Sequence, residues 1–267
     1  ALVLGFVLGR LGNKVETVNR FFEQFNTVMM TMINIVLKVA PIGIFCLIAR
    51  TFANLGVSGM LPMLKFILTV YGGLFIQLFV VYLIIFVLFT RLNPLRFLRK
   101  MLPVILFAFS TSSSNATIPL NLETLERKCG VDEKVASFTI PLGATINMDG
   151  TAIMQGVAVV FVAQAFGIDL TMTALLTVVI TAITASIGTA GVPGVGTIML
   201  AMVFESVGLP AEGIAMIMGV DRILDMGRTA VNVTGDATVT MCMASLTKTL
   251  DRNVFQQRDQ DLLNEPS

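Results

Sequence analysis

The stretch Asp221–Asp236 reads DRILDMGRTAVNVTGD, and the rest of the chain is best interpreted from it. Its polar residues recur at intervals of four, three, four and four, which on a helix places them within an arc of roughly 80°. In a soluble protein, this pattern would be the water-facing side of an amphipathic helix. Within a membrane, each charge would cost about 2.5–3.5 kcal/mol, so a line of charges predicts partners, water or a ligand. The polar residues are Asp221, Asp225, Arg228, Asn232 and Asp236.

The composition favours the membrane interpretation. Of the 267 residues, 55% are hydrophobic and 13% are charged, whereas soluble domains have about 25% charged residues. We therefore predict an integral membrane protein surrounded by the lipid bilayer. The net charge of +1 argues against a nucleic-acid partner, and the absence of histidine removes the commonest general base. The cysteines are few and far apart, which predicts no disulfide framework and no metal cluster: Cys46, Cys129 and Cys242.

Apolar segments of membrane-spanning length alternate with basic connections. Residues 1–8 resemble the end of a span. Residues 28–52 have the length of a span and are expected to be kinked near Pro41, and residues 66–90 form an uninterrupted apolar span. Basic residues cluster in the connection that follows position 90, and the positive-inside rule places this connection and the C-terminus in the cytoplasm. These residues are Arg91, Arg96, Arg99 and Lys100.

Two segments predict re-entrant helical hairpins, in which a polar tip is buried within the protein at membrane depth. In 94–128, an apolar half too short to cross the membrane leads to Ser110–Pro119, STSSSNATIP. In 170–208, two apolar halves flank Ser186–Gly196, SIGTAGVPGVG, whose glycine density permits close backbone approach. The alternative for the first segment is a flexible serine-rich cytoplasmic linker.

The apolar segment 132–166 is interrupted at Pro141–Thr151, PLGATINMDGT. Glycine, asparagine and aspartate between two apolar halves predict a discontinuous helix, whose unwound carbonyl groups are free to bind a cation. The alternative is a continuous helix with one buried and hydrogen-bonded aspartate, Asp149. A hairpin followed by a span with a polar middle occurs twice, at 94–166 and at 170–250, and this repetition is typical of transporters built from inverted repeats.

Four motifs, in their order along the chain, resemble the glutamate transporter family of dicarboxylate/amino acid:cation symporters. They are the serine-rich tip, Asn147–Thr151 (NMDGT), Gly191–Gly194 (GVPG), and Asp225–Thr229 (DMGRT) with the Asn232 and Asp236 that follow it. The resemblance extends to about Thr249 and covers the family's last five spans and both hairpins, without its first three spans. It implies an all-α multi-span membrane fold and a homotrimer in the cell membrane.

The resemblance also implies a division of the chain into a scaffold and a mobile transport domain. Residues 1–59 would belong to the trimer-forming scaffold, and 60–250 to the transport domain. The last residues, 251–267, are predicted to form a disordered cytoplasmic tail. Within the transport domain, the resemblance implies a sixth span, hairpin 94–128, seventh span 132–166, hairpin 170–208 and eighth span 211–250.

By the same resemblance, the protein couples inward Na⁺ movement to the uptake of L-glutamate or L-aspartate by elevator-type alternating access. Asp225 would accept the substrate ammonium group, and Arg228 would bind the side-chain carboxylate, which a guanidinium can do bidentately. Asn232 would bind the α-carboxylate. The other implied substrate-binding residues contribute hydroxyl or backbone groups: Ser113, Ser114, Thr151, Val192, Gly196 and Thr229.

The resemblance further implies three cation sites, and a hard ion such as Na⁺ prefers the oxygen ligands that they offer. One site would join Asn147 and Asp149 with residues of a span that this chain lacks. The other two would use mostly backbone oxygens: Gly143, Asn147 and Asn232 with the Asp236 carboxylate in one, and Thr145, Ser186, Ile187 and Thr189 in the other.

Several alternative functions remain open from the sequence. Within the family, the substrate could be a C4-dicarboxylate or a neutral amino acid, and the coupled ion could be a proton. Gln155 stands where animal members have a proton-carrying glutamate, which argues against proton cotransport by that route. An ion channel would leave Arg228 unexplained. An intramembrane protease is disfavoured because the chain lacks histidine and its aspartates share one helix face instead of forming a facing dyad.

Overall fold

The computed structural model describes residues 2–11, parts of 15–49, 60–187 and 189–257, and our structural statements refer to these residues. The chain divides into two compact units, Ala1–Ala49 and Arg50–Ser267.

In the first unit, helix α1 spans Leu2–Leu11, and helical residues recur between 16 and 49. The kink predicted near Pro41 and the predicted boundary at 59 lie outside the described residues.

The first described element of the second unit is a long apolar helix. It consists of α3 (Met60–Ile76), the π-helical turn η3 (Gln77–Tyr82) and α4 (Leu83–Thr90). The stretch Leu61–Thr90 is long and apolar enough to cross a membrane, with a mean hydropathy of 2.6 and only 17% of its most apolar window buried. Most of its apolar surface therefore faces outward, as expected for a helix in contact with lipid.

The first hairpin is formed by α5 (Pro94–Thr111) and α6 (Ser114–Glu123), which continues into the π-helical turn η4 (Thr124–Lys128). The chain reverses at Ser112, which adopts a left-handed conformation with φ 54°. The Ser113 hydroxyl then accepts a hydrogen bond from the Ala116 amide and so caps α6. The predicted hairpin is confirmed, and the alternative of a flexible linker was wrong.

The second predicted break is also present. Helix α7 (Glu133–Ile146) and helix α8 (Asp149–Ala165) are separated by Asn147 and Met148, whose backbone angles are not helical. Asp149 opens α8, where its negative charge is favoured by the positive end of the helix dipole. The segment is therefore a discontinuous helix, and the alternative of a continuous one was wrong.

The second hairpin consists of α9 (Met172–Ile187) and α10 (Val195–Ser206). Gly194, with φ 80°, precedes α10 directly. A short helix, α11 (Glu212–Met218), then leads to α12 (Asp221–Leu246). The sequence predicted one span over 211–250, but the helix is broken between α11 and α12, where Gly219 lowers the stability of a continuous helix.

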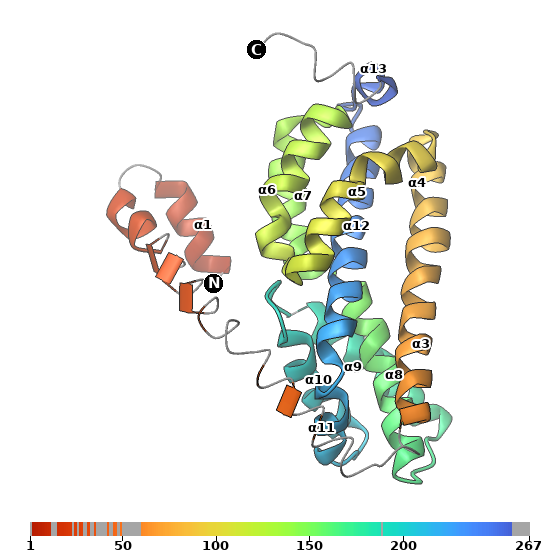
Figure 1. Ribbon diagram of the computed structural model, residues 1–267. Helices are drawn as coiled ribbons and strands as arrows, with labels where there is room; N and C mark the ends of the chain where they lie inside the picture. The colour runs from red at the N-terminus through yellow and green to blue at the C-terminus, as the bar shows by residue number, and fades with distance from the viewer. Residues whose placement is uncertain are drawn as a thin grey trace. The chain divides into compact units, whose positions relative to one another are not determined.

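Helix α12 is the central element of the second unit, and 18 of its 26 residues are buried. Figure 1 shows α5 and α6 beside one half of α12, and α3 and α8 pack against the other half. Leu224 and Val231 belong to an apolar core with α3, α8, α9 and α10, whereas Val233 and Met241 belong to a second core with α5 and α7. The two hairpin tips therefore meet between the two cores, near the polar residues of α12.

The structure describes the chain after α12 as far as Gln257. Helix α13 (Arg252–Gln256) is capped by the Asp251 side chain, and Phe255 is only 1% exposed because it packs in the second core. The Arg252 guanidinium also donates to the Thr90 carbonyl at 3.2 Å. The predicted disordered tail was therefore wrong for 251–257, since buried aromatic packing offsets the entropy of ordering these residues; residues 258–267 lie outside the described part of the chain.

We expect Phe255→Ala to destabilise the second unit by about 3 kcal/mol, because it removes a fully buried aromatic side chain. The apparent melting temperature of the detergent-solubilised protein should fall by about 5–10 °C. Leu95→Ala, which truncates a side chain that is 70% exposed, is the control and should change the melting temperature little. Equal melting temperatures for Phe255→Ala and the unchanged protein would show that α13 contributes nothing to stability.

Candidate functional site

The tips of the two hairpins touch each other at Gly191. Its carbonyl accepts a hydrogen bond from the Ser113 hydroxyl at 2.9 Å and another from the Asn115 amide at 3.1 Å. A Cβ atom at Gly191 would lie 2.7 Å from the Asn115 side-chain oxygen and 3.0 Å from the Ala144 carbonyl. A side chain at position 191 would therefore crowd this contact, which lies beside the end of α7.

A small pocket lies between these tips and the polar face of α12. Besides substrate-binding residues that the sequence predicted, it is lined by Ser112, Met148, Thr189, Ala190 and Gly191. Of the nine predicted substrate-binding residues, seven line the pocket: Ser114, Thr151, Val192, Gly196, Asp225, Thr229 and Asn232.

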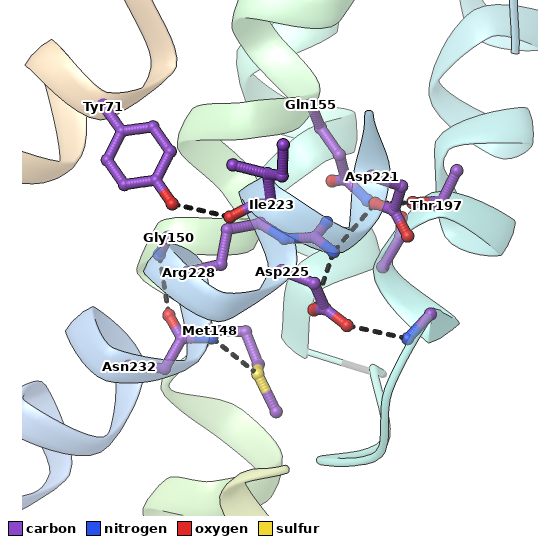
Figure 2. A network of polar contacts seen from close by, with 12 residues as sticks. Tyr71, Met148, Gly150, Gln155, Thr197, Asp221, Ile223, Asp225, Arg228 and Asn232 are labelled. Carbon is purple, nitrogen blue, oxygen red and sulfur yellow. Dashed lines mark hydrogen bonds and ion pairs between the residues drawn. The ribbon is translucent and has the colours of Figure 1, made fainter. Parts of the chain in front are cut away.

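Arg228 is the charged residue buried most deeply at this site, with 1% of its surface exposed. Its Nη2 atom donates to Asp225 at 2.8 Å and to Asp221 at 3.1 Å (Figure 2). Its Nε and Nη1 atoms are buried and have no hydrogen-bond partner within the described structure. Because an unsatisfied buried donor is costly, these two nitrogens indicate the position of a missing acceptor group.

Asp221 belongs to this site, although the sequence analysis did not assign it a role there. Its carboxylate accepts hydrogen bonds from Arg228 and from the Thr197 hydroxyl of α10. Its position at the start of the polar face of α12 was the signal available in the sequence. The neighbouring Gly196 leaves space for the guanidinium, since a Cβ atom there would lie 2.6 Å from Nη1 of Arg228.

Asp225 connects α12 to the tip of the second hairpin. One carboxylate oxygen accepts from Arg228, and the other accepts from the Gly194 amide at 3.0 Å. Each carboxylate oxygen can accept more than one hydrogen bond. Asp225 therefore retains the capacity to accept the ammonium group that the sequence analysis assigned to it.

Asn232 joins α12 to the break between α7 and α8. Its side-chain oxygen accepts from the Gly150 amide at 2.7 Å, and its side-chain nitrogen donates to the Met148 sulfur at 3.1 Å (Figure 2). A thioether sulfur is a weak acceptor, so this nitrogen is available for a stronger one such as a carboxylate.

The residues of one predicted cation site are close together around the Asp236 carboxylate. The Asn147 side-chain nitrogen donates to Asp236 at 3.0 Å and to the Asn232 carbonyl at 3.2 Å. A Cβ atom at Gly143 would lie 2.6 Å from the same Asp236 oxygen. The Gly143 carbonyl accepts from the Asn147 amide at 2.8 Å, so this oxygen already has one donor.

The residues of the second predicted cation site lie at the ends of α7 and α9. The Ser186 and Thr145 hydroxyls bond to carbonyl groups of their own helices, while the Ile187 side chain is 49% exposed. The Ser186 carbonyl accepts from the Thr189 amide at 3.1 Å. A cation here would be held mostly by the carbonyls of two helix C-termini, which carry partial negative charge.

Asp149, a residue of the third predicted cation site, has two partners that the sequence analysis missed. Gln77 and Tyr82 of η3 each donate to its Oδ2 atom at 2.8 Å. The signal available in the sequence was a single amide, Gln77, within the long apolar span 66–90.

Comparison with known proteins agrees with this geometry. Residues 1–246 match the model of the Sodium:dicarboxylate symporter family. The chain is 36% identical to Excitatory amino acid transporter 1 of Mus musculus over 99% of this chain and 48% of the relative. It is 40% identical to Neutral amino acid transporter A of Bos taurus (89% and 45%) and to Excitatory amino acid transporter 3 of Mus musculus (92% and 47%).

The chain thus spans about half the length of the curated relatives that it matches. The family model covers nearly all of the chain, and the helices, hairpins and broken helix agree with the transporter fold that the sequence predicted. The predicted family resemblance is confirmed: this chain belongs to the sodium:dicarboxylate symporter family.

Proposed function

We propose that this chain forms the substrate- and cation-binding part of a symporter that couples inward Na⁺ movement to the uptake of L-glutamate or L-aspartate. The observation that carries the proposal is Arg228, buried in a membrane protein with two nitrogens unpaired. A carboxylate is the acceptor that best matches a guanidinium in charge and geometry.

The charges around Arg228 favour an amino acid over a plain dicarboxylate. Asp221 and Asp225 set two carboxylates against one guanidinium, which leaves one negative charge uncompensated. A substrate with an ammonium group compensates this charge at Asp225, whereas a C4-dicarboxylate adds to it. One relative is named a neutral amino acid transporter. A neutral amino acid has no side-chain carboxylate, so it would leave Nε and Nη1 of Arg228 unpaired.

Sodium coupling is supported by the group around Asp236. The Asn147 side chain donates both to this buried carboxylate and to the Asn232 carbonyl, and Gly143 packs against Asp236. Carboxylate and carbonyl oxygens, the ligand type that hard cations prefer, therefore lie near one another here. Each positive charge that moves inward gains about 2.3 kcal/mol per 100 mV, so several ions would sustain a steep substrate gradient. Gln155, which donates to the Gly196 carbonyl at 3.2 Å, has no titratable proton for proton coupling.

The second hairpin would act as the lid of the substrate site. Three hydrogen bonds attach this hairpin to its surroundings. The Gly194 amide donates to Asp225, the Thr197 hydroxyl donates to Asp221, and the Gly191 carbonyl accepts from Ser113 of the first hairpin. A lid that closes only when substrate and cations satisfy these groups would couple their binding. We extend the proposal to elevator-type movement of 60–250, a homotrimeric scaffold in 1–59 and a cytoplasmic C-terminus.

The function is tested by uptake of labelled L-aspartate into proteoliposomes that contain the complete gene product. An inward Na⁺ gradient and an inward proton gradient are compared at a fixed membrane potential. We expect uptake with Na⁺ alone. Uptake driven only by protons would contradict the sodium sites, and no aspartate uptake under either gradient would favour a dicarboxylate or neutral substrate.

We expect Arg228→Ala to raise the KM for L-aspartate at least 30-fold, because it removes the partner of the side-chain carboxylate at a buried position. Arg222→Ala is the matched control on the same helix, since Arg222 donates to the Ser110 carbonyl at 3.4 Å and, within the described residues, forms no ion pair with Asp221 or Asp225. An unchanged KM in Arg228→Ala would contradict the carboxylate-binding role.

We expect Gly191→Ala to abolish tight closure of the hairpin tips, since its Cβ atom would clash with Asn115 and Ala144. Uptake should fall at least tenfold while the protein remains folded and membrane-inserted. Gly156→Ala, on α8, adds the same methyl group with no atom within 4 Å and serves as the control. Equal uptake by both variants would show that the tip contact has no role in transport.

A further inference from the structure

A π-helical turn interrupts the otherwise α-helical span Leu61–Thr90. The turn η3 covers Gln77–Tyr82, and its first and last residues are five positions apart. In an α-helix, side chains five positions apart diverge by about 140°. In a π-helical turn, residue i is hydrogen-bonded to residue i+5, which brings side chains five positions apart onto nearly the same face of the helix. Such turns occur frequently at functional sites.

The two side chains that this turn aligns bind the same atom. The Gln77 amide and the Tyr82 hydroxyl each donate to Oδ2 of Asp149 at 2.8 Å. No hydrogen bond within the described residues ends on Oδ1 of Asp149. Two donors on one oxygen fix the orientation of the carboxylate and leave its other oxygen for a different partner.

Helix α12 carries a glycine where this contact is made. A Cβ atom at Gly235 would lie 2.3 Å from the Tyr82 hydroxyl and 2.4 Å from the Asn147 side-chain nitrogen. That nitrogen in turn donates to Asp236 at 3.0 Å. Tyr82, which donates to Asp149, and Asn147, which donates to Asp236, therefore both pack against Gly235. This packing links the surroundings of the two carboxylates.

We propose that Gln77 and Tyr82 are positioning residues for cation binding: they hold Asp149 through Oδ2, so that Oδ1 remains available as a cation ligand. The inference rests on the proposed sodium coupling. It assigns a role to the π-helical turn, since without the turn the two donors would not reach one carboxylate oxygen. It also explains why two polar side chains occur in the middle of an apolar span.

The first experiment compares the sodium dependence of L-aspartate uptake in the complete protein and in Tyr82→Phe. We expect the sodium concentration for half-maximal uptake to rise about tenfold, the size expected for one hydrogen bond to a charged group. The KM for L-aspartate at saturating Na⁺ should stay within about twofold. Gln77→Met, which also removes one donor, should shift the sodium titration in the same direction.

Tyr71→Phe is the matched control. Tyr71 lies on the same helix and packs against Gly227 of α12, but its hydroxyl donates to the Ile223 carbonyl at 2.6 Å and not to an acidic residue. This variant should keep the sodium titration of the unchanged protein. If Tyr71→Phe shifts the sodium titration as much as Tyr82→Phe does, the proposal is overturned. The effect would then come from weaker packing of α3 against α12 and not from the Asp149 carboxylate.

A double-mutant cycle tests whether Tyr82 acts through Asp149. If it does, adding Tyr82→Phe to Asp149→Asn should weaken sodium binding little further. Fully additive effects would overturn the proposal. Sodium binding is read from the concentration dependence of thermal stabilisation in detergent, which requires no transport.

The thermal measurement also separates failure of this inference from failure of the proposed function. If the unchanged protein is neither stabilised by Na⁺ nor dependent on it for uptake, sodium coupling is wrong and this inference falls with it. If the unchanged protein responds to Na⁺ and Tyr82→Phe responds identically, only the positioning role is wrong. A lower melting temperature without any shift in the sodium titration would likewise overturn the positioning role.

Discussion

The ion pairs of Arg228 are the interaction on which the rest of the site depends. A guanidinium that is 1% exposed is tolerated inside the protein only because Asp221 and Asp225 compensate its charge. Both aspartates also accept hydrogen bonds from the second hairpin, through Thr197 and the Gly194 amide. The same charges that keep Arg228 buried therefore attach the proposed lid to α12.

The polar centre exists because the apolar packing is divided into two cores. Each core lies beside one half of α12, and the irregular backbone of both hairpin tips and of Asn147–Met148 falls between them. Unpaired backbone groups at membrane depth are tolerated where protein surrounds them. Glycines at 191, 196 and 235 allow neighbouring protein atoms to approach the backbone closely in this region.

Asn232 lies between the residues proposed to bind the substrate and those proposed to bind cations. Its side chain bonds to Gly150 at the start of α8, and its carbonyl accepts from Asn147, which also bonds to Asp236. A change in either group therefore alters the surroundings of the other. Coupling of this kind is reciprocal: under the proposed function, cations would strengthen substrate binding by the same factor by which substrate strengthens theirs.

The sequence by itself determined the local features of this protein. The polar period of Asp221–Asp236, the serine-rich tip and the interruption at 141–151 are patterns of neighbouring residues. They were sufficient to predict both hairpins and the broken span 132–166, but not the break between α11 and α12. Only the tertiary structure decided which distant side chains meet. Tyr82 reaches Asp149 across 67 positions and Arg252 reaches Thr90 across 162, because helix packing, and not sequence spacing, sets these contacts. For the same reason, the docking of Phe255 and the π-helical turn of η3 could not be read from the sequence: each is stabilised by partners that only the folded chain brings together.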